Sequence, residues 1–182
     1  MPDKKGIIEY FMEIDKLIDK PVDIIILGGC FLVLNGLKPS SPDIDMIIEG
    51  NSYNKIVYIT KQLNKKYSYE IDVMTEGYIE NIQLPENYIK DVKRYRRYRS
   101  NFRFVRLWLL SPYDIIISKI NRWKRKDVDD INTILSAFSI KRKKFDKRLT
   151  RFKIVSKQIF NKNLSQFYTL FEKKLKSSWL GF

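Results

Sequence analysis

The hydrophobic positions of the first half of the chain fall in short runs that are typical of strands. Four such runs lie at residues 23–29, 43–49, 69–75 and within 93–110. Residues 7–18 instead repeat apolar side chains every three or four positions, which indicates a helix that covers the sheet. The pattern therefore predicts an α+β fold, in which a small mixed β-sheet has flanking helices.

Helical spacing dominates the second half of the chain. Ser111 is a typical N-cap, Pro112 suits the first helical position, and Asp114 lies in the first turn. Two helices are predicted within 113–138, and the residues beyond them form a basic amphipathic helical pattern. We therefore predict one domain over residues 1–138 and a C-terminal basic helical segment over 139–182 that packs on it or extends from it.

The candidate chemistry is concentrated in residues 23–48, DIIILGGCFLVLNGLKPSSPDIDMII. An apolar strand ends in Gly28 and Gly29, where small residues let backbone N–H groups approach a phosphate. A short apolar helix and a loop then lead to Asp43 and Asp45, which are two apart on a strand and so share one face. Carboxylates that close repel each other unless a cation lies between them, and Mg²⁺ is the usual ion. The alternative is an Asp-rich turn in which Asp43 only caps.

The order of strand, Gly-Gly, helix and D-I-D resembles the nucleotidyltransferase fold of the DNA polymerase beta superfamily. Within it, the chain is most similar to the small branch that includes AbiEii-type toxins. This resemblance implies a third carboxylate on a later strand, and Asp72 in YEIDVM is the candidate because apolar residues flank it. Glu70 shares its face and is the alternative. The resemblance implies that Asp43, Asp45 and Asp72 bind Mg²⁺, with Mn²⁺ as the alternative metal.

A second part of the resemblance lies in SPYDIIISKINRWKRKDVDDINTIL. AbiEii-like proteins carry a lysine on one helix and Asp-x-x-Asp at the start of the next, where this chain has Lys119, Asp127 and Asp130. The resemblance implies that Lys119 neutralises charge as pyrophosphate leaves, while Asp127 and Asp130 orient Lys119 or the nucleotide. Each residue also fits a structural role, as a solvated lysine or as acids at a helix N-terminus.

The chain departs from the resemblance near the nucleotide. Relatives often have an arginine ahead of the Asp pair, whereas this chain has Lys38, a point charge without the planar fork of guanidinium. Lys38 is nevertheless the nearby base that we expect to contact the nucleotide, together with the backbone at Gly28 and Gly29. These differences leave the choice of nucleotide open.

Composition narrows the classes of function. The chain contains no histidine, which excludes His-based catalytic triads and the common zinc sites, and its single cysteine excludes an internal disulfide. No apolar run reaches the roughly 18–20 residues that span a bilayer, and the N-terminal residues lack a signal-peptide layout. We therefore expect a cytoplasmic protein without a membrane span.

Positive charge is concentrated in the second half. Residues 1–90 carry 10 Lys/Arg and 14 Asp/Glu, whereas residues 91–182 carry 25 Lys/Arg and 7 Asp/Glu, a net charge of +18. The segment 93–106 holds seven bases, no acid and interleaved aromatic residues. Such a segment suits a single-stranded nucleic acid, although an exposed ribbon with inward aromatic rings would show the same pattern. The candidate nucleic-acid-binding residues are Arg94, Arg96, Arg97, Arg99 and Arg103.

These expectations combine into one function and its alternatives. We expect a metal-dependent nucleotidyltransferase that moves NMP from an NTP to an acceptor hydroxyl, on RNA such as tRNA. The resemblance also implies a growth-arresting toxin with a partner antitoxin, and it admits a protein hydroxyl as acceptor. The alternatives are an inert nucleic-acid-binding protein on the same scaffold and a regulatory subunit that binds ATP without turnover.

Overall fold

The chain divides into two compact units. The computed structural model describes residues 1–79 and 81–179, with side chains described as far as residue 174. One unit combines Met1–Tyr78 with Glu86–Ser111, and the other combines Ile79–Pro85 with Pro112–Phe182. Helices occur together with a five-stranded mixed sheet and a three-stranded sheet, which confirms the predicted α+β class. The predicted boundary after residue 138 falls inside the second unit, and residues 180–182 of the predicted tail lie outside the described residues.

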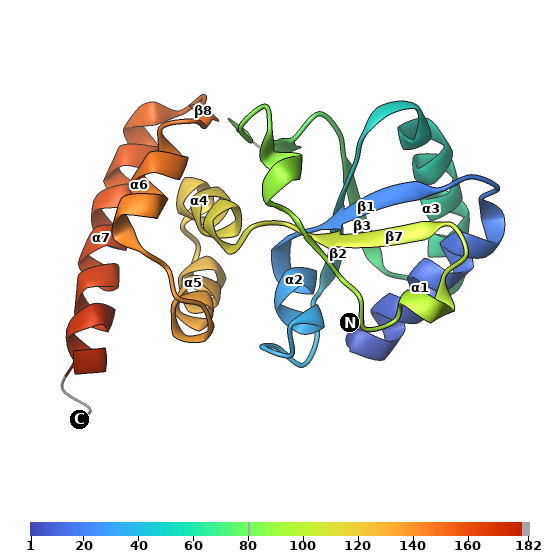
Figure 1. Ribbon diagram of the computed structural model, residues 1–182, viewed down its shortest axis with the longest axis horizontal. Coiled ribbons are helices and arrows are strands. Elements are labelled where there is room, and N and C mark those ends of the chain that lie inside the picture. Colours follow the sequence, from blue (N-terminus) through green and yellow to red (C-terminus); the bar gives the residue numbers. More distant parts are fainter. Residues whose placement is uncertain (80, 180–182) are drawn as a thin grey trace. The chain divides into compact units, whose positions relative to one another are not determined.

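A five-stranded mixed sheet is the frame of the first unit (Figure 1). Its strands, in the order β3-β2-β1-β7-β6, are β3 (Glu70–Met74), β2 (Asp43–Ile48), β1 (Val22–Ile26), β7 (Val105–Leu109) and β6 (Lys93–Arg94). β1 is antiparallel to β2 and parallel to β7, β2 is parallel to β3, and β6 is antiparallel to β7. Consequently β1 and β7 end at the same edge of the sheet at which β2, β3 and β6 begin.

The observed strands match the four apolar runs, with one difference. The run within 93–110 holds two strands, because the arginine-rich stretch between them leaves the sheet and includes a 3₁₀ turn, η3 (Arg99–Asn101). β6 is therefore only two residues long.

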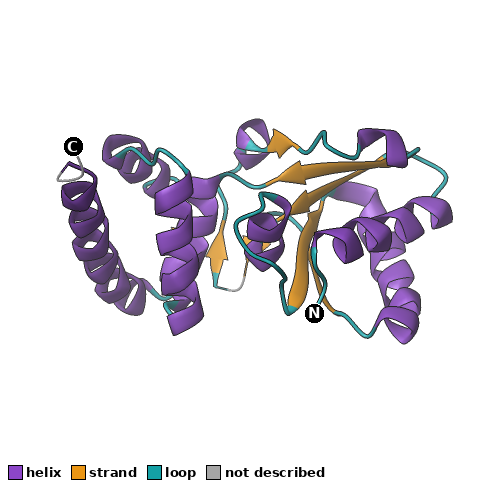
Figure 2. Cartoon of the chain, turned by 90° about the horizontal axis from the view of Figure 1, so that it is seen from below, coloured by secondary structure: helices purple, strands orange, loops and turns teal. Residues whose placement is uncertain are grey.

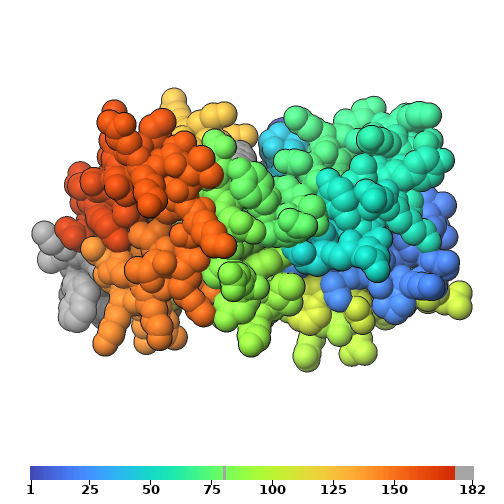
Figure 3. All heavy atoms as spheres, turned by 90° about the horizontal axis from the view of Figure 1, so that it is seen from above, coloured from blue at the N-terminus to red at the C-terminus, as the bar shows by residue number. Residues whose placement is uncertain are grey.

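Helices of the first unit bury the apolar stripes that their spacing indicates. They are α1 (Lys4–Leu17), α2 (Gly28–Leu34) and α3 (Tyr53–Tyr67), with the 3₁₀ turns η1 (Gly50–Ser52) and η2 (Tyr88–Asp91). α1 begins where Asp3 accepts a hydrogen bond from the backbone N–H of Gly6 at 2.8 Å. α3, which the sequence analysis does not name, connects the parallel strands β2 and β3. It buries Ile56, Ile59 and Leu63, and part of it forms the outer surface drawn in teal in Figure 3.

The two faces of the five-stranded sheet differ in polarity. Residues opposite each other on paired strands share a face. One face carries apolar residues that are fully buried, namely Ile24, Ile26, Ile44, Met46 and Ile48. The other face carries Ile25 and Ile47 together with a set of acids, namely Asp23, Asp43, Asp45, Glu70 and Asp72. The candidate site therefore lies on the polar face.

Asp15 fixes α1 to the chain just before β7. Its carboxylate accepts three backbone N–H groups, from Arg103 at 2.9 Å, Phe104 at 2.7 Å and Val105 at 2.6 Å. The side chain is nearly buried, so these bonds satisfy a charge that would otherwise be costly to remove from water. One acid thus joins the first helix to the start of a strand much later in the chain.

The second unit is mainly helical (Figure 2). Its helices are α4 (Pro112–Arg122), α5 (Arg125–Ala137), α6 (Arg142–Leu149) and α7 (Lys157–Trp179). α4 begins at Pro112, as predicted, and its isoleucines are buried together with Phe145, Phe160 and Phe167. The residues 79–85 belong to this unit because β5 (Ile82–Gln83) pairs antiparallel with β8 (Lys153–Ile154), in a small sheet that β4 (Tyr78–Ile79) completes.

A buried ion pair joins two helices of the second unit. The guanidinium of Arg148 on α6 donates two hydrogen bonds of 2.6 Å to the carboxylate of Asp114 on α4. Asp114 is fully buried and Arg148 is nearly so. Within the part of the chain that the structure describes, no helix is long and apolar enough to cross a membrane.

Candidate functional site

Gly28 and Gly29 lie where β1 passes into α2, close to Asp45 and to Ser41 respectively. Gly28 has φ +60°, and a Cβ added to it would lie 1.8 Å from Oδ2 of Asp45. A Cβ on Gly29 would lie 2.2 Å from Oγ of Ser41 and 3.8 Å from Oδ1 of Asp43. Glycine is therefore required at position 28 for two reasons, a left-handed backbone and the close approach of a carboxylate.

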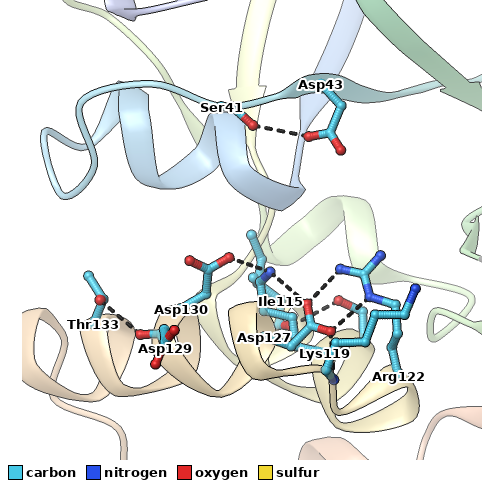
Figure 4. Close-up of polar contacts among 11 residues, drawn as sticks. Ser41, Asp43, Ile115, Lys119, Arg122, Asp127, Asp129, Asp130 and Thr133 are labelled. Carbon is cyan, nitrogen blue, oxygen red and sulfur yellow. Dashed lines mark hydrogen bonds and ion pairs between the residues drawn. The ribbon is translucent and has the colours of Figure 1, made fainter. Parts of the chain in front are cut away.

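Asp43 and Asp45 occupy the start of β2, as predicted, with the buried Ile44 between them. Both are half-buried and lie on the same face. Ser41 donates a hydrogen bond from Oγ to Oδ1 of Asp43 at 3.0 Å, which orients this carboxylate (Figure 4). The backbone is fixed as well, because the N–H of Leu27 donates to the carbonyl of Asp45 at 3.2 Å.

Cys30 lies in α2 close behind this acid pair. Its thiol is fully buried and donates to the backbone carbonyl of Asp43 at 3.2 Å. Burial raises the pKa of the Cys30 thiol far above its ordinary value, and the negative charges of Asp45 and Asp43 raise this pKa further. The thiol therefore stays protonated at neutral pH and is a packing residue, because only a thiolate is a good nucleophile.

The third predicted carboxylate lies on the neighbouring strand. β2 and β3 are parallel with Asp45 opposite Asp72 and Asp43 opposite Glu70, so all four acids share the polar face. Asp72 and Glu70 are both exposed. Among the residues that the structure describes, no group of three or more Asp, Glu or Cys side chains is close enough to hold a metal ion. The register favours Asp72 as the neighbour of Asp45 and Glu70 as the neighbour of Asp43.

The donor chemistry of these acids nevertheless suits a hard divalent cation. Asp43 and Asp45 present carboxylate oxygens from one face of a strand, and Asp72 stands in register beside them. Mg²⁺ prefers such oxygen ligands and is usually bound by one or two carboxylates while water or phosphate completes its shell. Lys38, the predicted nucleotide-binding base, is half-buried in the loop that connects α2 with β2.

Lys119, Asp127 and Asp130 form a buried ion network within the second unit (Figure 4). Nζ of Lys119 lies 2.7 Å from Oδ2 of Asp130 and 3.4 Å from Oδ1 of Asp127. The Lys119 side chain is 4% exposed and that of Asp127 is fully buried. The alternative of a solvated lysine therefore does not describe Lys119, whereas Asp127 does serve as an acid in the first turn of α5, where it accepts the backbone N–H of the N-cap residue.

Arg122 also belongs to this network, although it was not predicted from the sequence. Its guanidinium donates to both oxygens of Asp127, at 2.9 Å and 2.6 Å, and the backbone N–H of Lys124 adds a third bond at 3.0 Å. Burial opposes ionisation of Asp127, but Arg122, Lys119 and the Lys124 N–H more than offset it, so the pKa of Asp127 lies below its ordinary value. The basic link between the two predicted helices could have indicated this contact, because a short link places the end of the first helix near the first turn of the second.

Of the five predicted nucleic-acid-binding arginines, Arg94 belongs to β6 and the other four lie between β6 and β7 of the first unit. Arg94 is half-buried, and its guanidinium carbon lies 5.5 Å from the centre of the Trp108 ring. Arg96, Arg97 and Arg99 are exposed, as is Arg103, which lies over the Phe104 ring at 4.7 Å. The interleaved rings of Tyr95, Tyr98, Phe102 and Phe104 are half-buried.

Comparison with models of protein families yields a match over nearly the whole chain. A family model described as "Nucleotidyltransferase of unknown function (DUF6036)" matches residues 5–178. No curated protein and no solved structure gives a significant match.

Proposed function

Since the chain belongs to this family of nucleotidyltransferases, DUF6036, we propose that it moves NMP from an NTP to an acceptor hydroxyl with the help of Mg²⁺. The observation that carries the proposal is the contact between the acid pair and the glycine junction. The carboxylates of Asp43 and Asp45 share one face, and Asp45 approaches Gly28 so closely that no side chain fits between them. Gly29 lies similarly close to Ser41, the residue that bonds to Asp43. Cation-binding oxygens and phosphate-accessible backbone are thereby placed side by side.

In the proposed reaction, one bond to the α-phosphorus is made and one is broken, and a proton passes from the acceptor hydroxyl to Asp72. The acceptor oxygen bonds to the α-phosphorus, the bond from that phosphorus to the α,β-bridging oxygen breaks, and pyrophosphate leaves. Asp72 accepts the proton of the acceptor hydroxyl, which its exposure permits. The backbone N–H groups near Gly28 and Gly29 hold the triphosphate, and Lys38 supplies a positive charge to it.

Asp43, Asp45 and Asp72 are the residues that would hold the metal, with Mn²⁺ as an alternative to Mg²⁺. When bound, the metal polarises phosphoryl oxygens and neutralises the charge that develops on them. Ser41 fixes the orientation of Asp43 through its 3.0 Å hydrogen bond, so this carboxylate is in place before a metal arrives. Within the second unit, Asp130 and Asp127 hold the ammonium of Lys119, the residue to which the resemblance assigns neutralisation of the leaving pyrophosphate.

RNA, such as tRNA, is the acceptor that the charge of the chain favours. The net charge of +18 in residues 91–182 attracts a polyanion, and the arginines after β6 lie among half-buried aromatic rings. A role as a growth-arresting toxin with a partner antitoxin follows only from the likeness to AbiEii-type proteins, and it belongs to the same proposal.

A transfer assay tests this proposal directly. Purified protein is incubated with Mg²⁺, total RNA and each radiolabelled NTP in turn, beside the Asp43→Asn/Asp45→Asn variant. We expect label from one or more NTPs in an RNA band with the wild type, and a loss in the variant that exceeds the roughly 100-fold typical of an outer-shell change. Label on a protein band would overturn the RNA assignment alone. No transfer from any nucleotide, despite tight RNA binding, would indicate an inert nucleic-acid-binding protein.

A further inference from the structure

A basic groove lies at one edge of the five-stranded sheet, within the first unit. Its volume is about 490 Å³, and its lining includes Asn35, Tyr95 and four bases, namely Lys93, Arg94, Arg96 and Arg97. No acid lines it. The four bases fall within five consecutive residues, so a single segment of chain supplies the charge of the groove.

The arginines of this groove differ from paired arginines elsewhere in the chain. Arg106 forms an ion pair with Asp23 at 2.6 Å, whereas the described residues offer no carboxylate within ion-pairing distance of Arg94, Arg96 or Arg97. Arg94 is instead held over the indole ring of Trp108. Unneutralised guanidinium groups gathered in a groove form a site for phosphates, since each can donate two parallel hydrogen bonds.

Two lining residues of the groove lie at the end of the sheet where β1 and β7 finish and β2 begins, which is also where the candidate carboxylates lie. Lys93 at the start of β6 pairs with Leu109 at the end of β7, which also lines the groove, and Asp43 begins β2 at this same edge. Three strand spacings of about 4.8 Å separate β2 from β6, or roughly 14 Å.

α2 provides a second, independent link between the carboxylates and the groove. Its seven residues, about 10 Å in length, run from Gly28 beside Asp45 to Leu34, whose carbonyl accepts the Tyr95 hydroxyl at 3.5 Å. A single-stranded RNA whose reacting hydroxyl lies at Asp43 and Asp45 can therefore place its neighbouring phosphates in the groove.

Tyr95 gives the groove an aromatic wall. Its ring is half-buried and lies 6.3 Å from the ring of Tyr98, at a tilt of 37°. Burial raises the pKa of Tyr95, the neighbouring Tyr98 raises it further and Arg97 opposes the rise, so the hydroxyl is neutral at working pH. Charge on one segment with a ring among it is the combination that single-stranded nucleic acid requires.

We propose that this groove binds the phosphodiester backbone of a single-stranded RNA acceptor next to its reacting end, an inference that rests on the proposed function. Arg94, Arg96 and Arg97 contact the phosphates, and Tyr95 contacts a base. Arg99 and Arg103, although equally expected from the sequence, lie outside the lining of the groove and contribute only general charge. To bind an RNA duplex, the protein would need lysines and arginines distributed over a broad face rather than within one short segment.

The inference is tested with two variants that each remove two exposed arginines from the same segment. Binding of a fluorescein-labelled single-stranded oligoribonucleotide is followed by anisotropy with EDTA present and no nucleotide. We expect Arg96→Ala/Arg97→Ala to raise Kd at least tenfold at low salt and to reduce the slope of log K against log salt by about 1.4, or about 0.7 for each lost contact. Arg99→Ala/Arg103→Ala should change Kd less than threefold and leave the slope unchanged.

Several outcomes would overturn the groove assignment. One is an equal loss of RNA affinity in the two variants, and another is no loss of affinity in either. A third is an RNA hairpin that binds as tightly as the single strand and loses as much affinity in Arg96→Ala/Arg97→Ala, the groove variant. The Asp43→Asn/Asp45→Asn protein should retain RNA binding. If the groove variant behaves as expected while the wild type transfers no nucleotide, the groove assignment stands as an RNA site and the proposed function is wrong.

Discussion

The paired carboxylates of Asp43 and Asp45 should cost free energy when no cation neutralises them, because like charges on one strand face repel. Asp43→Asn/Asp45→Asn removes this repulsion and keeps an oxygen to accept the hydrogen bond from Ser41. We therefore expect the variant to melt no lower than the wild type in EDTA, as measured by circular dichroism. A fall of several degrees would show that the charged pair stabilises the fold.

Gly28 allows a sharper test, because the chain offers a matched glycine. Gly28→Ala strains a backbone at φ +60° and drives a Cβ into Asp45, whereas Gly50→Ala strains a similar backbone at φ +70° with no atom within 4 Å. Each should lose about 1 kcal/mol or more of unfolding free energy from backbone strain. Only Gly28→Ala should also lose nucleotide transfer. Equal nucleotide transfer by the two variants would show that the reaction does not depend on the position of Asp45.

Sequence periodicity could predict that Asp43 and Asp45 share a face, because a strand has a period of two residues. It could not predict that Ser41 bonds to Asp43, since this contact depends on how the preceding loop turns. The contact of Gly28 with Asp45 was equally hidden, because it joins two strands across a helix and a loop.

Among the elements, α1 depends on a single acid for its attachment to the chain before β7. Asp15→Ala leaves three backbone N–H groups without their acceptor, and we expect a loss of about 2–4 kcal/mol in unfolding free energy. Glu13→Ala is the control on the same helix, because Glu13 forms surface ion pairs with the exposed Lys16 and Lys66. Its expected cost is at most about 1 kcal/mol. Urea unfolding measures both, and similar costs would contradict the role of Asp15.

The junction of α4 and α5 should respond to acid through Asp127. Because its pKa is lowered in the folded protein, the unfolded chain binds a proton first as the pH falls, so stability is lost on going below about the ordinary value of 3.8. Asp127→Asn should be about 2 kcal/mol or more less stable at pH 7 and should lose less stability on acidification than the wild type. Asp129→Asn, at an exposed position on the same helix, should follow the wild-type pH curve in chemical unfolding.

Local patterns predicted most of the elements but not how far apart in sequence their partners lie. The strands β1, β2 and β3 and the paired helices α4 and α5 follow from apolar runs, caps and helical spacing. The pairing of β5 with β8 could not be predicted, because each strand is only two residues long and their partnership is set by the packing of the second unit. α3 was not predicted, although its apolar residues Ile56, Ile59 and Leu63 follow helical spacing.

For the whole molecule, the division into units predicts where a core substitution is felt. Ile82 is fully buried and belongs to the second unit, although the chain on both sides of residues 79–85 belongs to the first. Ile82→Ala should cost about 2–4 kcal/mol and raise hydrogen exchange in α6 and α7 more than in β1 and β2. Ile24→Ala, a fully buried position of the first unit, should show the opposite distribution. Uniform exchange in both variants would mean that the two units open together.

The central position of β1 in its sheet affects how the protein folds during translation on the ribosome. β2 follows β1 closely in the chain, but the strand on the other side, β7, is made much later. A growing chain therefore holds the central strand with one edge unpaired while everything between β2 and β7 is translated, and exposed edges are where chains associate wrongly. The three amides that Asp15 binds arrive at the same late moment, so the link between the first helix and β7 forms only when β7 has emerged. Slow translation of residues 75–105 would prolong that exposure, and chaperones would matter most during it.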